Sequence, residues 1–240
     1  MPPSPAEFVL ATRGVALDTM DSDRTEHATT ALLLIDVIND MDFPGSEALV
    51  RQAEPMARRL AALKARALRA GIPAIYINDN FGRWRSDFRH LVDHCTQDDV
   101  PGQNVARTLR PSEDDYFVLK PKHSAFFDTT LDTLLDYLGT DSVIVTGIAG
   151  NICVLFSAND AYMRDLKLYV PSDCTVSNTV EENDYALKQM QSVLKADITS
   201  SVALDLERLA FGRRGRVLAS PMRGRRNLTD TQTHQERSRS

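Results

Sequence analysis

The chain has 240 residues, enough for one sizeable hydrophobic core, and its apolar fraction of 42% and charged fraction of 25% are typical of a globular protein. No apolar run approaches the ~20 residues of a membrane span, and the start M-P-P-S-P-A-E lacks the basic and apolar segments of a signal peptide. We therefore expect no membrane contact and a cytoplasmic location. The three cysteines are too few for a disulfide scaffold and lack metal-ligand spacing, so we expect reduced thiols.

The net charge of −5 conceals a basic carboxyl-terminal segment. Residues 211–240 contain eight arginines and two acidic residues, which gives this segment a formal charge of +6. Such a segment can bind nucleic acid, but no aromatic residues are interleaved with its arginines. We therefore interpret residues 212–240 as a disordered tail and do not expect a nucleic-acid partner. Residues 1–29 are polar and read as an irregular arm, which leaves one domain over 30–211.

Within this domain, apolar runs of strand length alternate with helical patterns. In chain order, strands are predicted over 31–36, 72–78, 116–120, 142–146, 168–171 and 196–198, and helices over 54–70, 129–138, 151–166, 181–194 and 204–209. The polar stretch 79–111 is too long for a simple connection, so we expect it to cover a substrate, with a short helix around 88–95.

Alternating strands and helices predict a parallel sheet with helices on both faces, because each right-handed crossover must pack back on the sheet. We expect a single doubly wound α/β/α domain of Rossmann-like type. Pro55 suits the first turn of the helix over 54–70, and Gly71 and Gly139 are expected to end helices.

Three of the predicted strands deliver a reactive side chain to the same edge of the sheet. A-L-L-L-I-D ends at Asp36, Y-F-V-L-K ends at Lys120, and S-V-I-V-T-G-I-A-G-N-I-C ends at Cys153. Parallel α/β sheets place their sites at the carboxyl ends of strands. An acid, a cation and a thiol at one edge predict an enzyme with a cysteine nucleophile.

Each of these residues also has a structural explanation. Cys153 follows Asn151, a suitable N-cap, so the helix dipole favours its thiolate; alternatively, it is a small buried residue of an amphipathic helix. Asp36 is suited to accept the thiol proton, or it caps a nearby loop. Lys120 is suited to pair with Asp36, or its side chain reaches water.

The segments around these residues resemble the isochorismatase-like cysteine hydrolase superfamily, which includes nicotinamidases and N-carbamoylsarcosine amidases. The resemblance covers about residues 30–205 and rests on L-L-I-D-V-I-N-D-M, K-P-K-H-S-A-F-F-D-T-T-L and V-T-G-I-A-G-N-I-C-V-L-F-S-A-N-D-A-Y, with V-P-S-D-C-T-V-S beyond them. It implies a catalytic triad of Asp36, Lys120 and Cys153. It also implies a cis peptide between Ile148 and Ala149, and an oxyanion site formed by the N–H groups of Ala149 and Cys153.

The mechanism implied by the resemblance is acyl transfer. Asp36 takes the Cys153 proton, the sulfur attacks an amide carbonyl, and Asp36 returns the proton to the leaving amine. Water activated by Asp36 then releases the acyl group, while Lys120 stabilises both charges. The resemblance further implies a homo-oligomer.

Two departures from the family limit the choice of reaction. Nicotinamidases carry an acidic residue and histidines after the second strand, whereas this chain has N-D-N-F-G-R-W-R-S-D-F, with no histidine before His90. One Asp and two Asn are poor transition-metal ligands, so we expect no metal and no cofactor. His90, His94 and His123 show no metal-ligand pattern. The Y-T-A-Q-P-G-like segment of isochorismatases is replaced by Y-I-N-D-N, which makes isochorismate a weaker candidate substrate.

Substrate choice is expected to depend on the region after the second strand. The residues predicted to line the substrate site are Asn78, Asp79, Phe81, Trp84 and Phe126. Trp84 could equally anchor its loop on the domain. Cys95 and Cys174 are expected to be structural.

The sequence therefore predicts a metal-independent cysteine hydrolase that acts on a small amide or ureido C–N bond. Two alternatives remain open. One is a vinyl-ether hydrolase that uses Asp36 as acid, and the other is a catalytically silent protein that binds a small molecule.

Overall fold

Both faces of the central sheet are apolar, and this determines the architecture. The protein is described by a computed structural model that covers residues 29–79, 87–97 and 99–211. In strand β1 (Thr30–Ile35), Leu32 and Leu34 pack into one hydrophobic cluster, whereas Leu33 and Ile35 pack into the other. Because successive side chains of a strand point to opposite faces, a continuous apolar run requires cover on both sides.

The sheet is parallel, with strand order β3-β2-β1-β4-β5 and β6 paired to β4. The strands after β1 are β2 (Ala74–Asp79), β3 (Tyr116–Lys120), β4 (Ser142–Ile148), β5 (Lys167–Tyr169) and β6 (Thr175–Val176). The chain builds outward from β1 to β3 and then returns to the other side of β1 with β4. The strand order therefore reverses between β1 and β4, which is where open α/β sheets bind ligands.

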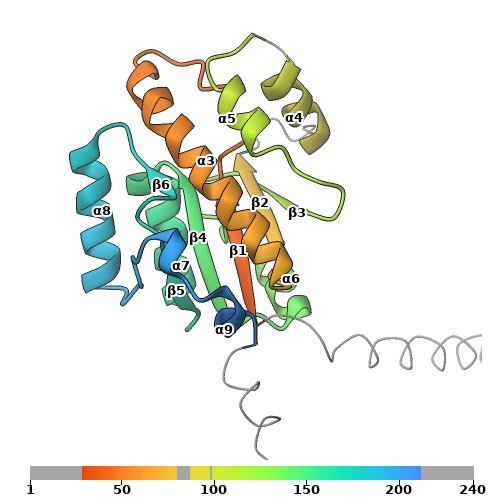
Figure 1. The fold of residues 1–240 in the computed structure, drawn as a ribbon, viewed down its shortest axis with the longest axis vertical. Coiled ribbons are helices and arrows are strands. Elements are labelled where there is room, and N and C mark those ends of the chain that lie inside the picture. Colours follow the sequence, from red (N-terminus) through yellow and green to blue (C-terminus); the bar gives the residue numbers. More distant parts are fainter. Residues whose placement is uncertain (1–28, 80–86, 98, 212–240) are drawn as a thin grey trace, which may run out of the picture.

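Helices cover both faces, so the predicted three-layer α/β/α domain is confirmed. One face packs against α3 (Glu47–Arg69), α4 (Phe88–Gln97), α5 (Gln103–Thr108) and α9 (Leu206–Phe211). The other face packs against α6 (Leu131–Leu138), α7 (Leu155–Tyr162) and α8 (Val180–Ser192). Figure 1 shows α3, the longest of these helices, lying across the sheet.

Helix α3 differs from the prediction at its start. It begins at Glu47, so Pro55 lies inside the helix and not in its first turn. Leu49 and Ala53 lie before the proline and are buried in the core. Their packing against the sheet outweighs the helical hydrogen bond that proline cannot donate.

The predicted helix over 151–166 is also divided differently. Residues Gly150–Val154 form a π-helical turn, η2, and α7 begins only at Leu155. Ala149 occupies the position before η2, so the prediction that Asn151 is an N-cap is wrong. Gly139 ends α6 with a left-handed φ of 66°, as predicted.

The shortest elements were predicted least well. The predicted strand at 196–198 is reduced to an isolated bridge between Tyr169 and Asp197. The two-residue β6 and the six-residue α5 were not predicted, because segments this short carry no periodic pattern. The short helix expected around 88–95 is present as α4. The predicted arm, apart from residue 29, and the predicted tail lie outside the described residues.

Among the described residues, no helix is long and apolar enough to cross a membrane.

Candidate active site

The three reactive side chains predicted at the strand ends meet around the ammonium group of Lys120. Its Nζ lies 2.9 Å from Asp36 Oδ2 and 3.5 Å from Cys153 Sγ. Lys120 is fully buried, so its side chain does not reach water as the structural alternative required. A buried ammonium is stable only when paired, and Asp36 supplies that pair.

Asp36 is fixed by the way the chain leaves β1. Its φ of 51° lies in the left-handed region, which Asp tolerates better than most residues. Its backbone N–H donates to Ile77 O at 2.8 Å, and its Oδ1 accepts the N–H of Asp79 at 2.9 Å. Both carboxylate oxygens are therefore engaged, one by an amide and one by Lys120.

Strands β1 and β4 approach closely just below the site, and this depends on Gly147. A Cβ at this position would lie 2.1 Å from Ile35 O, and the φ of 115° is accessible mainly to glycine. Gly147 thus permits β4 to bring the turn that carries Cys153 beside Asp36.

The turn that carries Cys153 is held by Ser177, just after β6, and by Asn183 of α8. The Ile148–Ala149 peptide is cis, as predicted, and η2 follows directly. Ser177 Oγ accepts the Asn151 N–H at 3.0 Å and donates to Asn183 Oδ1 at 3.1 Å. A Cβ on Gly150 would lie 2.2 Å from that same Asn183 oxygen, so the turn fits only without a side chain there.

The electrostatics of the cluster favour a neutral thiol in the resting protein. Burial, and then the Asp36 carboxylate, raise the pKa of Cys153 to about 12, although Lys120 opposes the change. The sequence-based expectation that the helix dipole would favour the thiolate is therefore wrong for this state. Burial also raises the pKa of Asp36, and Lys120 only partly offsets this. For Lys120, burial lowers the pKa, but the combined attraction of Asp36, Cys153 and Asp79 outweighs burial and the net shift is upward.

The predicted substrate-binding residues are placed differently from one another. Asp79 lies at the edge of the cluster, with Oδ2 3.8 Å from Lys120 Nζ. Asn78 is buried, and its Nδ2 donates to Ile38 O at 2.8 Å, so it braces the loop after β1. Phe126 is buried beneath the guanidinium of Arg164, which lies 4.6 Å from its ring centre. Phe81 and Trp84 lie outside the described residues.

One residue at the cluster was not predicted as a site residue. His123 Nδ1 lies 3.7 Å from Cys153 Sγ. In the sequence, His123 shows no metal-ligand pattern and no other sign of a role. Its position three residues after Lys120, in the segment K-P-K-H-S-A-F, was the available signal.

Within the part of the chain that the structure describes, no group of three or more His, Cys, Asp or Glu side chains is arranged to hold a metal ion. Near the cluster, the side chains that could donate to a metal are Asp36, Asp79, Cys153 and His123, and the Lys120 ammonium lies beside the first three. A buried ammonium at this position competes with any cation.

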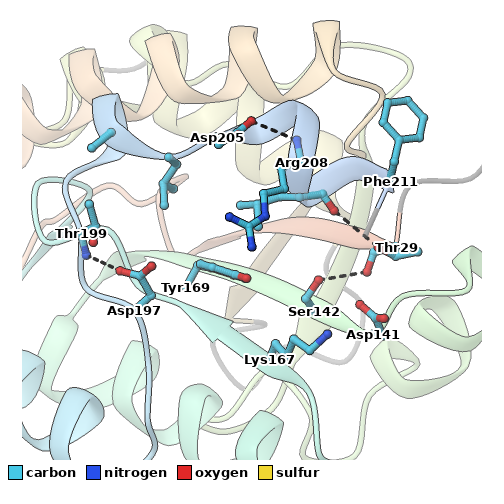
Figure 2. A pocket seen from close by; sticks show the side chains of 13 residues that line it. Thr29, Asp141, Ser142, Lys167, Tyr169, Asp197, Thr199, Asp205, Arg208 and Phe211 are labelled. Carbon is cyan, nitrogen blue, oxygen red and sulfur yellow. Dashed lines mark hydrogen bonds between the residues drawn. The ribbon is translucent and has the colours of Figure 1, made fainter. Parts of the chain in front are cut away.

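A hollow of about 1190 Å³ lies at the opposite edge of the sheet, where β4 and β5 begin (Figure 2). Its wall includes Asp197 and Asp205, whose carboxylates accept the N–H groups of Thr199 and Arg208. These contacts order local turns. None of the three clustered residues lines this hollow, so we assign the chemistry to the other edge.

Residues 30–201 match the family model described as the isochorismatase domain. The chain is 44% identical over 173 residues to YaaI of Bacillus subtilis (strain 168), an uncharacterized isochorismatase family protein, covering 72% of this chain and 94% of that protein. It is 28% identical over 173 residues to the ureidoacrylate amidohydrolase RutB of Methylobacterium radiotolerans, covering 62% and 67% of the two chains. The crystal structure of N-carbamoylsarcosine amidase from Thermoplasma acidophilum has a TM-score of 0.57 at 23% identity, covers 74% of this chain and 99% of its own, and shows the shared fold.

Proposed function

The chain belongs to the isochorismatase family of hydrolases, and we propose that it is a metal-independent cysteine hydrolase that cleaves a C–N bond of a small amide or ureido compound. Asp36, Lys120 and Cys153 act as its catalytic triad. The observation that carries the proposal is the position of the buried Lys120 ammonium, within 3.5 Å of the thiol and 2.9 Å of the carboxylate. The ureidoacrylate amidohydrolase and N-carbamoylsarcosine amidase among the similar proteins support a C–N bond as the target.

Acylation follows from the charges at the cluster. The thiol is neutral at rest, so the sulfur must lose its proton as it attacks the carbonyl carbon, and the Asp36 carboxylate accepts that proton. The new negative charge on the carbonyl oxygen is received by the N–H groups of Ala149 and Cys153. Asp36 then donates the proton to the nitrogen, the C–N bond breaks, and a thioester with Cys153 remains. Water hydrolyses this thioester in a second step.

Lys120 stabilises negative charge on both the Asp36 carboxylate and the Cys153 sulfur. Without a cation, the carboxylate would be too costly to ionise in a buried position, and the sulfur would not form a stable thiolate. A single ammonium between the two groups stabilises negative charge on either one, so the proton can move from sulfur to carboxylate without creating an unpaired buried charge.

A second candidate is vinyl-ether hydrolysis with Asp36 as the acid. The pKa of Asp36, which burial raises, favours it, because a carboxyl group that holds its proton more strongly is suited to protonate a substrate. This reaction does not require a nucleophile. The two candidates therefore differ in whether Cys153 is needed.

The experiment that separates them is turnover on a panel of small primary amides, ureido acids and vinyl ethers by wild type, Cys153→Ala and Asp36→Asn. The cysteine hydrolase requires that amide or ureido turnover is lost in both variants, and that a thioester on Cys153 is trapped by acid quench and peptide mass spectrometry. Vinyl-ether turnover that survives Cys153→Ala but not Asp36→Asn would support the second candidate. Binding without turnover in every case would support a silent binding protein.

A further inference from the structure

His123 contacts the sulfur of Cys153 from an exposed position. Its Nδ1 lies 3.7 Å from Cys153 Sγ, and its ring packs at a tilt against Phe156, with ring centres 5.6 Å apart. Phe156 lies three residues after Cys153, so the histidine contacts both the nucleophile and the helix that follows it. His123 is exposed, whereas Asp36 and Lys120 are buried.

Hydrogen bonds hold the segment that carries His123 against α7, so the backbone of this segment helps to fix the position of the imidazole beside the sulfur. Lys120 Nζ donates to Lys122 O at 3.2 Å, which turns the chain back at the end of β3. Beyond the histidine, the Ala125 N–H donates to Ser157 Oγ at 2.9 Å, and Ser157 Oγ donates to Cys153 O at 2.7 Å.

A second anchor acts one residue away from the histidine. Ser124 Oγ is hydrogen-bonded to Asp160 Oδ2 of α7. The residues after His123 are thus tied to α7, and Lys122 before it is tied to Lys120, which restricts where the imidazole can lie.

The second half of the proposed reaction needs a base that water can reach. Asp36 is poorly placed for this, because Oδ1 accepts the Asp79 N–H, Oδ2 accepts the Lys120 ammonium, and the residue is buried. A water that attacks a thioester on Cys153 comes from solvent, to which His123 is exposed and Asp36 is not. An imidazole nitrogen within 4 Å of the sulfur is within reach, directly or through one water, of a nucleophile approaching the adjacent carbonyl carbon.

We propose that His123 is a further catalytic residue, the general base that activates water for hydrolysis of the Cys153 thioester. The inference rests on the proposed function. Nδ1 takes one proton from water as its oxygen bonds to the acyl carbon, and the C–S bond then breaks with its electron pair on sulfur. The imidazolium returns the proton to the thiolate, so the products are a carboxylic acid and the resting thiol. Asp36 thus serves acylation and His123 serves deacylation.

The test uses 4-nitrophenyl acetate as an acyl donor, so the natural substrate need not be known. Wild type is expected to release a burst of 4-nitrophenolate, acetylate Cys153 and then turn over. His123→Gln is expected to keep the burst but to lower the steady rate about 100-fold, the size of a general-base contribution, with acetylated Cys153 accumulating in peptide mass spectra. His90→Gln, which changes an exposed histidine on α4, is the matched control and should behave as wild type.

A rescue experiment separates a base from a structural support. Acetylated His123→Ala is desalted, and loss of the acetyl group is followed with and without added imidazole. Imidazole is expected to accelerate deacylation of His123→Ala, which leaves space for it, and not of His123→Gln, where the side chain fills that space.

The outcomes distinguish this inference from the proposal on which it rests. If wild type acetylates Cys153 but His123→Gln deacylates at the wild-type rate, His123 is not the base and the triad proposal is unaffected. A burst lost together with the steady rate would also overturn the division between the two residues. If wild type never acetylates Cys153, both proposals fail.

Discussion

Replacing Lys120 with methionine tests the charge coupling of the cluster directly. Methionine keeps most of the volume of the buried side chain but removes the ammonium between Asp36 and Cys153. Lys120 holds the pKa of Cys153 below the value that burial and Asp36 would otherwise impose. We therefore expect the thiolate fraction, and with it the rate of alkylation, to fall in Lys120→Met.

The size of the effect follows from the 3.5 Å separation of Nζ and Sγ. Two unit charges at this distance interact by about 5 kcal/mol at an effective dielectric constant near 20. Water at the partly exposed sulfur reduces the interaction by about half. The remaining energy corresponds to about 2 pKa units, so alkylation below the thiol pKa should slow about 100-fold.

The assay is the second-order rate of iodoacetamide reaction with Cys153 between pH 7 and 10, followed by peptide mass spectrometry. Lys122→Met is the matched control, because Lys122 is exposed and contacts the cluster only through its backbone oxygen. Unfolding by urea is measured in parallel, since removing one partner of a buried ion pair costs about 3–5 kcal/mol. A folded Lys120→Met protein that reacts within threefold of wild type would refute the coupling and remove the main support for the triad.

Three further predictions concern the thiols and the π-helical turn Gly150–Val154. Cys95 and Cys174 are fully buried, so a disulfide reagent should modify only Cys153 in the native protein at pH 8. After unfolding, it should modify all three thiols. Modification of all three thiols in the native protein would contradict the packing. The pKa values of Cys153 and Cys174 are each raised from 9.0 to about 12, so above pH 9 the unfolded chain loses protons that the native protein keeps. The free energy of unfolding should therefore fall as the pH rises from 9 toward 12. Urea midpoints measured from pH 8 to 10.5 check this prediction, and a flat profile would exclude it. Gly150→Ala should lower turnover more than tenfold, because its Cβ would lie 2.2 Å from Asn183 Oδ1. The double variant Gly150→Ala/Asn183→Ala should recover part of that loss. A Gly150→Ala protein as active as wild type would show that the turn tolerates a side chain.

Some features of the fold follow from local sequence. The continuous apolar run of β1 has only one stable environment, a sheet covered on both faces, and so it predicts the layered architecture without reference to any other segment. The strand Tyr116–Lys120 and the helix end at Gly139 were predicted at their observed positions, because each depends on neighbours in the chain.

The start of α3 and the form of the turn Gly150–Val154 depend on contacts from distant segments. Pro55 was placed in a first turn by its local preference, but buried Leu49 and Ala53 extend the helix before it. Likewise, Asn151 has the side chain of an N-cap, yet Ser177 takes its backbone N–H and the turn winds as a π-helix.

The sequence by itself predicted that Asp36, Lys120 and Cys153 lie at one edge of the sheet, because the carboxyl ends of parallel strands meet there and the surrounding segments resemble a known family. Only the tertiary structure decided how they act on one another. The pKa of Cys153 rises where the local helix pattern predicted a fall, because burial and the carboxylate of Asp36 both raise it. The segment K-P-K-H-S-A-F likewise shows that His123 follows Lys120 but not that it contacts the sulfur, because that contact depends on hydrogen bonds to a helix more than 30 residues away in the chain.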